Sequence, residues 1–372
     1  MNNRAVLLAN LGSPENPDVP SVRRYLNQFL MDPYVIQLPW LLRRLIVGLF
    51  VLPFRPKNSA EAYQSVWTDR GSPLIALSRD LLNAVREKTG MPVSISMRYG
   101  NPSIESELLK LAAEPGIEEI LFIPLYPHYA DSTVTTSIRE AERVIAKYGL
   151  SVRLNVLKPF YNRPDYIDAL VHSASDHLAN PESFDHILFS YHGLPELHIT
   201  KADPTGSHCL KVNDCCNVPS PAHATCYRHQ VMETTRLFVK QAGLQQDQYT
   251  VTFQSRLGRA KWLEPSTEET LKELAGKGIR KILVLCPAFI TDCLETLEEI
   301  QIQGEEVFRE AGGESLVLVP CLNAQPRWVD TLVSWSENPA ADQLAQLALT
   351  RKPPGSYSFR SSARSSSEPS TK

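Results

Sequence analysis

Two segments of the chain place chemically active side chains directly after apolar runs of strand length. His192 and Gly193 follow the run 186–191, and an acid-rich segment, 292–299, follows the run 281–286. In an open parallel sheet, the loops at the carboxyl ends of the strands form the ligand crevice. A neutral imidazole and a carboxylate that face each other there can bind a divalent metal or move protons. The sequence therefore predicts a site built from both segments.

The acid-rich segment supports two hypotheses. Asp292 and Glu295 have the spacing of a capping box, with Asp292 at the N-cap of a helix. Glu295 and Glu299 are four residues apart and would share one helix face, where like charges cost stability unless a cation or a proton is their partner. The second hypothesis makes both glutamates candidate catalytic residues.

Other polar and aromatic side chains follow further predicted strands. Arg98 and Tyr99 lie in the segment 97–102, which follows the second strand, and Ser255 lies in the segment 253–258, which follows the sixth, with Trp262 just beyond. Arginine suits carboxylates and aromatic rings suit the faces of a flat apolar ligand. Singly, such residues next to strands are more often part of the core, so only their combination indicates a pocket.

Four of the seven cysteines, Cys209, Cys215, Cys216 and Cys226, lie in one loop-like segment, 201–227. Such a cluster in a cytosolic protein indicates a metal before a disulfide. The spacing lacks the paired knuckles of common zinc ribbons. A [2Fe–2S] cluster needs four sulfurs and tolerates varied spacing. From the spacing alone, an iron–sulfur cluster, zinc and no metal all remain open.

Composition narrows the class of protein. The 372 residues allow two domains, and a net charge of -3 gives no reason to expect nucleic acid. The first apolar stretch, Ala5–Ala9, is too short for the core of a signal peptide, so we expect a cytoplasmic protein with reduced thiols. The most lipophilic segment, 38–54, contains two arginines and falls short of the roughly 20 residues that span a bilayer. It is either a buried helix or a lip that rests on a membrane.

The elements that position these residues alternate between strands and helices, which predicts α/β lobes with parallel sheets. The expected strands are 5–10, 93–98, 119–124, 152–157, 186–191, 250–254, 281–286 and 315–320. We expect an N-terminal lobe over 1–160, a C-terminal lobe over 161–325, a helical extension over 326–351 and a disordered tail over 352–372.

The two sets of strands look related. Residues 4–14 align without gaps on 185–195, so that Leu11 takes the place of His192. A second pair of segments aligns in the same way, 116–123 with 278–285. The alignment predicts two similar four-stranded halves that face each other, with the imidazole on the second half alone.

Together, the motifs 190–193, 253–255 and 292–299, with Trp262, resemble the ferrochelatases over most of the chain, to about Asn323. The likeness is greatest to the Gram-negative bacterial branch, which inserts Fe(II) into protoporphyrin IX. The resemblance implies two similar Rossmann-like lobes around a porphyrin cleft, as in chelatases generally.

The resemblance also implies residue roles. His192 and Glu295 would face the centre of the macrocycle and the entering iron, and Glu299 would belong to an acidic path. The residues implied to line the pocket are Leu11, Tyr63, Arg98, Tyr99, Ser255 and Trp262. The segment 38–54 resembles the mobile lip of the family, which favours a protein at the periphery of the inner membrane.

Some bacterial ferrochelatases carry a [2Fe–2S] cluster on a cysteine segment after the catalytic histidine. Cys209, Cys215, Cys216 and Cys226 resemble that variant, which favours iron–sulfur over zinc. Asp131 stands where animal ferrochelatases have one cluster cysteine, so ligation of the animal type is excluded.

Three alternative functions were also considered for this sequence. Coproporphyrin III could replace protoporphyrin IX as the substrate, and an excess of arginines in the cleft would favour it. A non-catalytic α/β protein that binds a metal or a porphyrin would not need both His192 and Glu295. A nucleotide-dependent oxidoreductase is disfavoured because no G-x-G-x-x-G motif follows the first strand.

Overall fold

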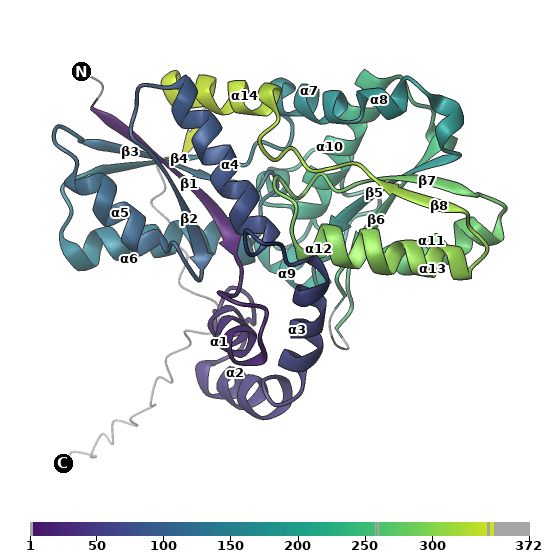
Figure 1. The fold of residues 1–372 in the computed structure, drawn as a ribbon, viewed down its shortest axis with the longest axis horizontal. Helices are drawn as coiled ribbons and strands as arrows, with labels where there is room; N and C mark the ends of the chain where they lie inside the picture. Colours follow the sequence, from purple (N-terminus) through teal and green to yellow (C-terminus); the bar gives the residue numbers. More distant parts are fainter. Residues whose placement is uncertain (1–2, 257, 259, 341–342, 346–372) are drawn as a thin grey trace, which may run out of the picture.

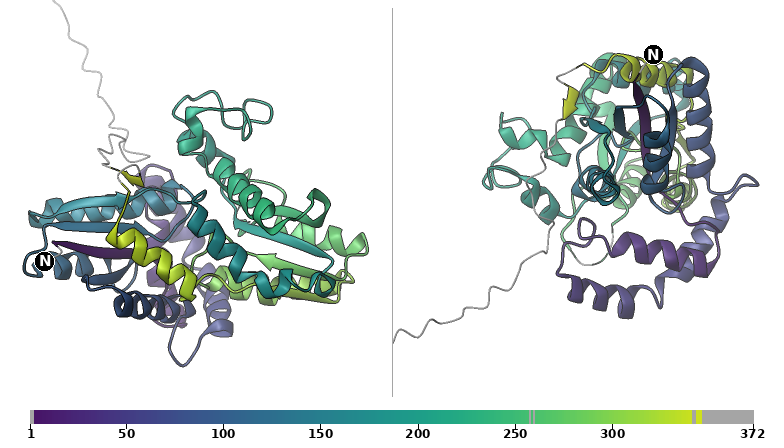
Figure 2. Two further views of the ribbon diagram at one scale, coloured as in Figure 1. Left: turned by 90° about the horizontal axis from the view of Figure 1, so that it is seen from above. Right: turned by 90° about the vertical axis from the view of Figure 1, so that its left-hand side faces the viewer.

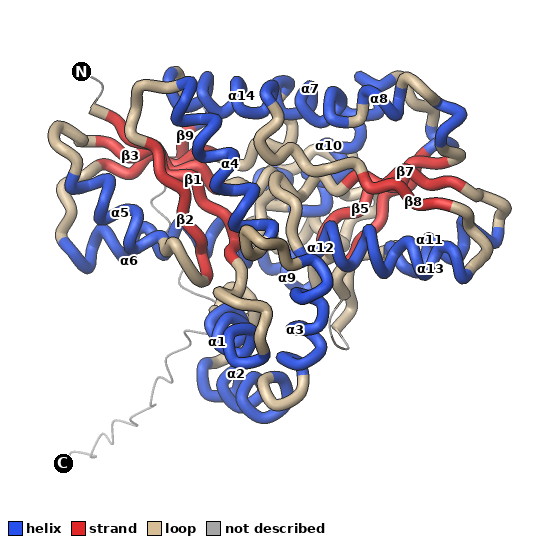
Figure 3. The backbone as a smooth tube through the Cα atoms, viewed as in Figure 1, coloured by secondary structure: helices blue, strands red, loops and turns tan. Residues whose placement is uncertain are grey.

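Two parallel sheets form the framework of the protein (Figures 1 and 3). The structure, a computed structural model, describes residues 3–256, 258, 260–340 and 343–345. The first sheet contains β1 (Arg4–Gly12), β2 (Val93–Tyr99), β3 (Glu119–Pro124) and β4 (Arg153–Leu157), and the second contains β5 (His186–His192), β6 (Tyr249–Gln254), β7 (Lys281–Leu285) and β8 (Ser315–Leu318). All eight predicted strands are present, because strands that are buried on both faces appear in sequence as nearly continuous apolar runs.

The two sheets have the same topology. The strand order is β2-β1-β3-β4 in the first sheet and β6-β5-β7-β8 in the second, and the pairing among these strands is parallel. Strands β1 and β5, which the sequence alignment matched, both occupy the second position of their sheet. The predicted repeat and the α/β fold class are therefore confirmed.

Helices cover both faces of each sheet. The longer helices are α1 (Val19–Leu30), α3 (Arg55–Val66), α4 (Pro73–Lys88), α5 (Ile104–Ala113), α6 (Thr136–Tyr148), α7 (Pro164–Ser173), α10 (Tyr227–Ala242), α11 (Thr267–Gly276) and α14 (Pro326–Glu337). The shorter ones are α2 (Trp40–Ile46), α8 (Ser175–Leu178), α9 (Glu196–Ala202), α12 (Leu294–Thr296) and α13 (Glu305–Glu310). Three π-helical segments, 47–51, 131–135 and 297–304, and short 3-10 turns at 181–183, 221–224 and 246–248 complete the elements.

Alternation along each central strand sends side chains to opposite faces. In β1, Val6 and Leu8 pack towards α4, and Leu7 packs towards α5 and α6. One continuous cluster of buried apolar side chains includes residues of both β1 and β5. Helix α14 packs on α4 of the first lobe and on α7 of the second. This shared core and the bridging helix hold the two lobes together.

The C-terminal part of the chain differs in one respect from the expectation of a helical extension over 326–351. Helix α14 ends at Glu337, and a two-residue strand, β9 (Leu344–Ala345), pairs antiparallel with the edge strand β4. The predicted disordered tail, 352–372, lies outside the described residues.

The lipophilic segment 38–54 is not a buried helix. It forms α2 and the following π-helical turn, which project with α1 and α3 beneath the two sheets in Figure 1. Its exposed apolar side chains are Trp40, Leu41, Leu42, Leu45, Leu49, Phe50 and Phe54. Arg43 is buried, and its guanidinium donates to the carbonyls of Ile36 and Leu38. Within the described residues, no helix is long and apolar enough to cross a membrane.

Candidate active site

His192 is the last residue of β5, a strand flanked on both sides by neighbours in its sheet. Its Nδ1 lies 2.6 Å from the carbonyl oxygen of Gly193. Since a carbonyl can only accept, Nδ1 carries the proton, and the lone pair of the neutral ring is on Nε2. The backbone carbonyl of His192 also accepts from the Tyr227 hydroxyl, at 2.8 Å. The half-buried imidazole is therefore fixed in the tautomer that can bind a metal through Nε2.

Gly193 lets the chain pass very close to the neighbouring strand end. Its amide donates to the carbonyl of Gln254 at 2.7 Å. A Cβ at this position would lie 2.8 Å from that carbonyl oxygen and 3.3 Å from the Trp262 ring. The glycine thus brings Trp262 and Gln254 against the His192 turn.

Gln254 joins the strand end of His192 to the acid-rich segment. It pairs with His192 in the parallel register of β5 and β6. Its side-chain carbonyl accepts from the Ser190 hydroxyl at 2.8 Å, and its amide nitrogen donates to the backbone carbonyl of Glu295 at 2.7 Å. Gln254 was not predictable as a site residue, because a glutamine on a strand carries no chemical signal by itself.

The Glu299 carboxylate is held by the turn that follows β6. It accepts from the Ser255 amide at 2.6 Å, from the Ser255 hydroxyl at 2.5 Å and from the Gln254 side chain at 3.2 Å. Ser255 has a positive φ of 65°, which aims both of its donors at one carboxylate. Ser255 and Glu299, which the sequence predicted separately as a pocket residue and as part of an acidic path, are therefore in direct contact.

Glu295 has different neighbours from Glu299. Its charge acts on the phenols of Tyr25 and Tyr63, on helices α1 and α3. Burial, followed by the charges of neighbouring groups including Glu295, raises the pKa of Tyr63 well above its ordinary value. The four-residue spacing predicted a shared α-helical face. The chain instead changes from α12 to a π-helical segment between the two glutamates, and such segments are frequent at functional sites.

Asp292 does not cap the helix as expected. The capping box is made by Cys293 and Thr296. The buried Asp292 carboxylate instead accepts from the Thr296 hydroxyl at 3.0 Å, from the Cys321 amide at 3.2 Å and from the Asn323 side chain at 2.7 Å. It therefore anchors the start of the acid-rich segment to the loop after β8.

Arg98 and Tyr99 are held by an acid that the sequence analysis did not select. The carboxylate of Asp32, which is buried, lies 2.6 Å from the Arg98 guanidinium and accepts from the Tyr99 hydroxyl at 2.9 Å. The Thr136 hydroxyl donates to the same oxygen at 2.5 Å. Arg98 is thus paired with a buried carboxylate of the protein itself.

The remaining predicted pocket residues come from both lobes. Leu11, at the end of β1, packs against the apolar cluster of α1 and α3, which includes the buried ring of Tyr63. Trp262 pairs with Pro195 in an isolated bridge after the His192 turn. Helix α3 packs against the acid-rich segment. Tyr63, on α3, and the glutamates of that segment therefore lie on elements that are in contact.

The four cysteines of the 201–227 segment are neighbours in the structure. The side chain of Cys226 influences the pKa of both the Cys209 and the Cys216 thiol, and that of Cys215 influences the pKa of Cys216. The interaction with Cys226, followed by burial, raises the pKa of the Cys216 thiol far above its ordinary value. Among the residues that the structure describes, no three His, Cys, Asp or Glu side chains form a group that could hold a metal ion.

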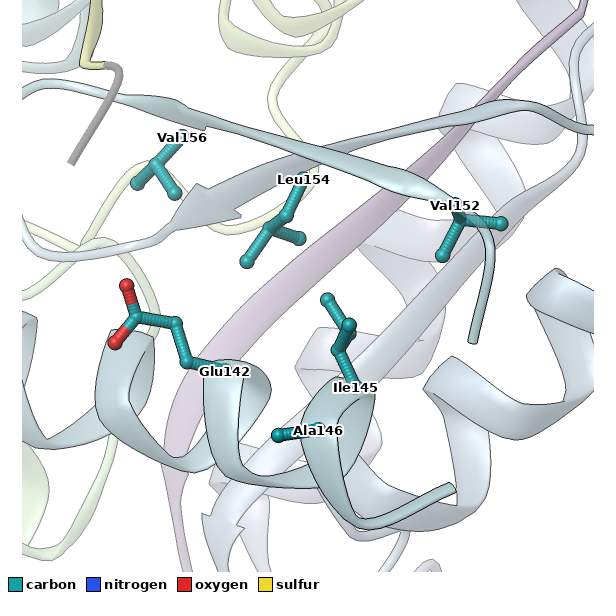
Figure 4. Close-up of a pocket in the computed structure, with 6 residues that line it drawn as sticks. All are labelled: Glu142, Ile145, Ala146, Val152, Leu154 and Val156. Atoms are coloured by element: carbon teal, nitrogen blue, oxygen red, sulfur yellow. The ribbon is translucent and has the colours of Figure 1, made fainter. Parts of the chain in front are cut away.

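A separate cavity lies in the first lobe. It has a volume of about 250 Å³ between α6 and β4 and is lined by Glu142, Ile145, Ala146, Val152, Leu154 and Val156 (Figure 4). None of these residues belongs to the site described above. The cavity is therefore not a second entrance to that site.

Comparison with solved structures shows which known proteins share this fold. The fold is similar to that of SirB from Bacillus subtilis with Fe3+, with a TM-score of 0.52 and 15% identity over 91% of this chain and 96% of that one. It is also similar to the sirohydrochlorin chelatase SirB from Bacillus subtilis subspecies spizizenii in complex with cobalt, with a TM-score of 0.51 and 13% identity over 92% and 98% of the two chains. The architecture is thus that of the two-lobed chelatases.

Sequence comparison narrows the class to one family. The ferrochelatase family matches residues 3–339. A ferrochelatase of Pseudomonas fluorescens (strain Pf0-1) is 57% identical over 91% of this chain and 98% of its own length, and one of Azotobacter vinelandii is 54% identical over 91% and 100%. The chain belongs to the ferrochelatase family. It is accordingly a metal chelatase of the lyase class that acts in haem biosynthesis.

Proposed function

We propose that this chain inserts Fe(II) into protoporphyrin IX at the carboxyl end of β5, with Nε2 of His192 facing the macrocycle. The observation that carries the proposal is the bond between Nδ1 of His192 and the Gly193 carbonyl, because it leaves Nε2 as the lone-pair nitrogen. Nε2 can replace a water ligand of the entering Fe(II), and Glu295 is the second group that faces the substrate iron.

The chemistry requires the ring to bend. A free porphyrin is nearly flat and carries two pyrrole N–H protons in its plane, so iron enters only when the ring is distorted and both protons leave. A pocket that fits a bent ring better than a flat one lowers the barrier. Leu11, Tyr63 and Trp262 would supply the walls of that pocket. Glu295 accepts a proton, and Glu299, which Ser255 orients, passes it outward.

Protoporphyrin IX is favoured over coproporphyrin III. Coproporphyrin carries two more propionates, which need additional cationic partners. Arg98, the arginine that the sequence analysis assigned to the pocket, is paired with Asp32 at 2.6 Å. An anaerobic assay with Fe(II) and each porphyrin tests this choice. Faster turnover of coproporphyrin would contradict it, and binding without product would support a non-catalytic binding protein.

The four cysteines are proposed to hold a [2Fe–2S] cluster. A [2Fe–2S] cluster needs four thiolates shared between two irons, and Cys209, Cys215, Cys216 and Cys226, which lie in one segment and influence one another's pKa values, supply that number. When bound, such a cluster could stabilise the loop or sense oxidants. Metal insertion transfers no net electrons.

Metal and sulfide analysis of the anaerobically purified protein tests the cluster. We expect about two irons and two acid-labile sulfides per chain. Cys226→Ser should bleach the protein, whereas Cys321→Ser, at a buried cysteine outside the segment, should leave its colour unchanged. Stoichiometric zinc without sulfide would overturn the assignment.

The exposed segment 38–54 is proposed to rest on the inner membrane of the cell, with the rest of the protein in the cytoplasm. Leu41 and Phe54 expose 73% and 71% of their surface, and apolar patches of this kind mark interaction sites. The variant Phe50→Ser with Phe54→Ser should bind anionic vesicles less than the parent does. Leu197→Ser, at an exposed leucine on α9, is the matched control, and equal loss in both would contradict the proposal.

A further inference from the structure

Three histidines converge on the backbone of the adjacent cysteine pair. Nε2 of His208 and Nε2 of His223 lie 2.7 Å and 2.8 Å from the carbonyl oxygen of Cys215. Nδ1 of His229 lies 2.7 Å from the carbonyl oxygen of Cys216. Because a carbonyl only accepts, each ring donates one N–H. The three donors come from different parts of the chain, namely the loop after α9, a 3-10 turn and helix α10.

These bonds control the conformation of one residue in particular. The carbonyl of Cys215 belongs to the peptide plane before the Cα of Cys216, and the carbonyl of Cys216 belongs to the plane after it. Since peptide units are planar, holding both planes fixes φ and ψ of Cys216. Neighbouring side chains diverge in an extended backbone, so Cys215 and Cys216 can serve one cluster only in a defined bend. Asp214, just before them, has a positive φ of 52°.

The rings also hold one another. His223 and His229 stack with centroids 3.6 Å apart and planes within 9° of parallel. The His208 ring lies edge-on to His223 at 5.4 Å. The donors therefore form one packed unit, so a shift of either carbonyl would disturb all three rings.

Arg228 supplies a charge to the same cysteine pair. Its Nη1 lies 3.8 Å from the sulfur of Cys215 and 3.6 Å from the sulfur of Cys216. A guanidinium stabilises negative charge on sulfur, and the charge near a cluster is one of the factors that set its reduction potential. The reduced cluster carries one more negative charge than the oxidised cluster, so a nearby cation favours reduction.

We propose that His208, His223 and His229 are positioning residues that clamp the Cys215 and Cys216 carbonyls for cluster binding, and that Arg228 tunes the potential of the bound cluster. The inference rests on the proposed [2Fe–2S] cluster and extends it to residues that do not ligate iron. Figure 2 shows the segment before α10 projecting from the second lobe, and its Cys209 and Cys226 belong to the buried apolar cluster that β5 shares.

Paired substitutions test the clamp on the full-length protein. His223→Leu and His229→Leu remove the donors, whereas His223→Gln and His229→Asn keep an N–H at the Nε2 and Nδ1 positions. His172→Leu, at an exposed histidine on α7, is the control. The readouts are the acid-labile sulfide content, the visible spectrum and the half-life of the colour in air. Partners of this kind typically contribute 10- to 100-fold, so we expect about a 10-fold shorter half-life in the leucine variants and near-parental values in the amide variants.

The outcomes distinguish failure of the histidine clamp from failure of the cluster assignment. Leucine variants that keep the parental half-life and spectrum would overturn the clamp while leaving the cluster intact. A parental protein without sulfide would overturn the cluster assignment and the clamp with it. For Arg228→Gln, a redox titration followed by electron paramagnetic resonance should show a more negative midpoint potential at unchanged sulfide content. An unchanged potential would overturn the role of Arg228.

Discussion

The ends of β1 and β5 occupy the same position in two sheets of the same topology, yet they carry different side chains. At the end of β1, Leu11 packs into an apolar cluster, and Gly12 turns with a φ of 109° against Tyr99. At the end of β5, His192 holds a fixed tautomer, and Gly193 turns against Gln254. The turn is retained in both lobes while the chemical group is present in one. In the proposed function, this repeated scaffold carries the metal-binding imidazole in the second lobe alone, and the first lobe supplies part of the pocket wall.

The largest separation is expected between two glutamates of the acid-rich segment. Glu295→Gln should lower kcat by about 100-fold, because it removes the proposed proton acceptor. Glu298→Gln should have little effect, since Glu298 accepts a hydrogen bond from Gln303 at 2.6 Å on the exposed side of the segment. Steady-state assays of both variants check the difference. Equal rates would mean that Glu295 has no role beyond its backbone bond to Gln254.

The two turn glycines should fail in different ways. A Cβ at Gly12 would lie 1.8 Å from the Tyr99 carbonyl oxygen, so Gly12→Ala should destabilise the first lobe strongly. A Cβ at Gly193 would lie 2.8 Å from the Gln254 carbonyl oxygen, a smaller conflict that still forces a backbone shift at the His192 turn. Since small misplacements of reacting groups can cost up to about 100-fold, Gly193→Ala should lose about 10-fold or more in activity and should lower the melting temperature less than Gly12→Ala does.

Thermal melts and assays of both glycine variants test this, with Gly276→Ala as a control at a position where a Cβ meets no neighbour. A Gly193→Ala protein of parental activity would show that the His192 turn tolerates displacement.

A smaller effect is expected where the lobes meet. His128, which follows β3, is buried against Tyr191 and Tyr227 of the second lobe, and its Nε2 lies 2.8 Å from the Thr234 hydroxyl. Burial lowers the pKa of His128 from 6.5 to about 3. The neutral ring therefore contributes stability that is fully present above pH 6.5 and is lost as the pH falls towards 3, amounting to about 2–3 kcal/mol by pH 4.5.

His128→Gln keeps a donor for Thr234 but does not titrate. Its melting temperature should depend less on pH between 7 and 4.5 than that of the parental protein. Parallel pH profiles for the two proteins would exclude His128 as a source of acid sensitivity.

The framework was predictable because its signals are local. The eight buried strands are continuous apolar runs, and the repeat is visible as a gapless alignment of 4–14 on 185–195. Strand β9 was not predictable, since two residues carry no period and their pairing with β4 depends on contacts far away in the chain. The register that pairs His192 with Gln254, next to Ser255, follows from the positions of these residues at the ends of two neighbouring strands.

The hydrogen bonds within the site were harder to predict from the sequence. Asp292 has the spacing of a helix cap, but its carboxylate instead accepts a hydrogen bond from the side chain of Asn323, which lies 31 residues further on. Asp32 and Arg98 are 66 residues apart in the sequence, and no local pattern predicts that they form a pair. The π-helical turn that separates Glu295 from Glu299 likewise depends on packing against neighbouring elements. Long-range hydrogen bonds therefore account for most of what the sequence did not predict.

The most direct test of the central claim compares the two equivalent strand ends in one assay. Under anaerobic Fe(II) and protoporphyrin IX, His192→Ala should lose kcat by about 100-fold or more while its melting temperature stays near the parental value. Leu11→Ala should raise KM by a few-fold, because it trims an apolar wall, and should change kcat by less than about twofold. A His192→Ala protein that retains more than about a tenth of the parental kcat, or a Leu11→Ala protein that loses kcat to the same extent, would contradict the assignment of the chemistry to the second lobe.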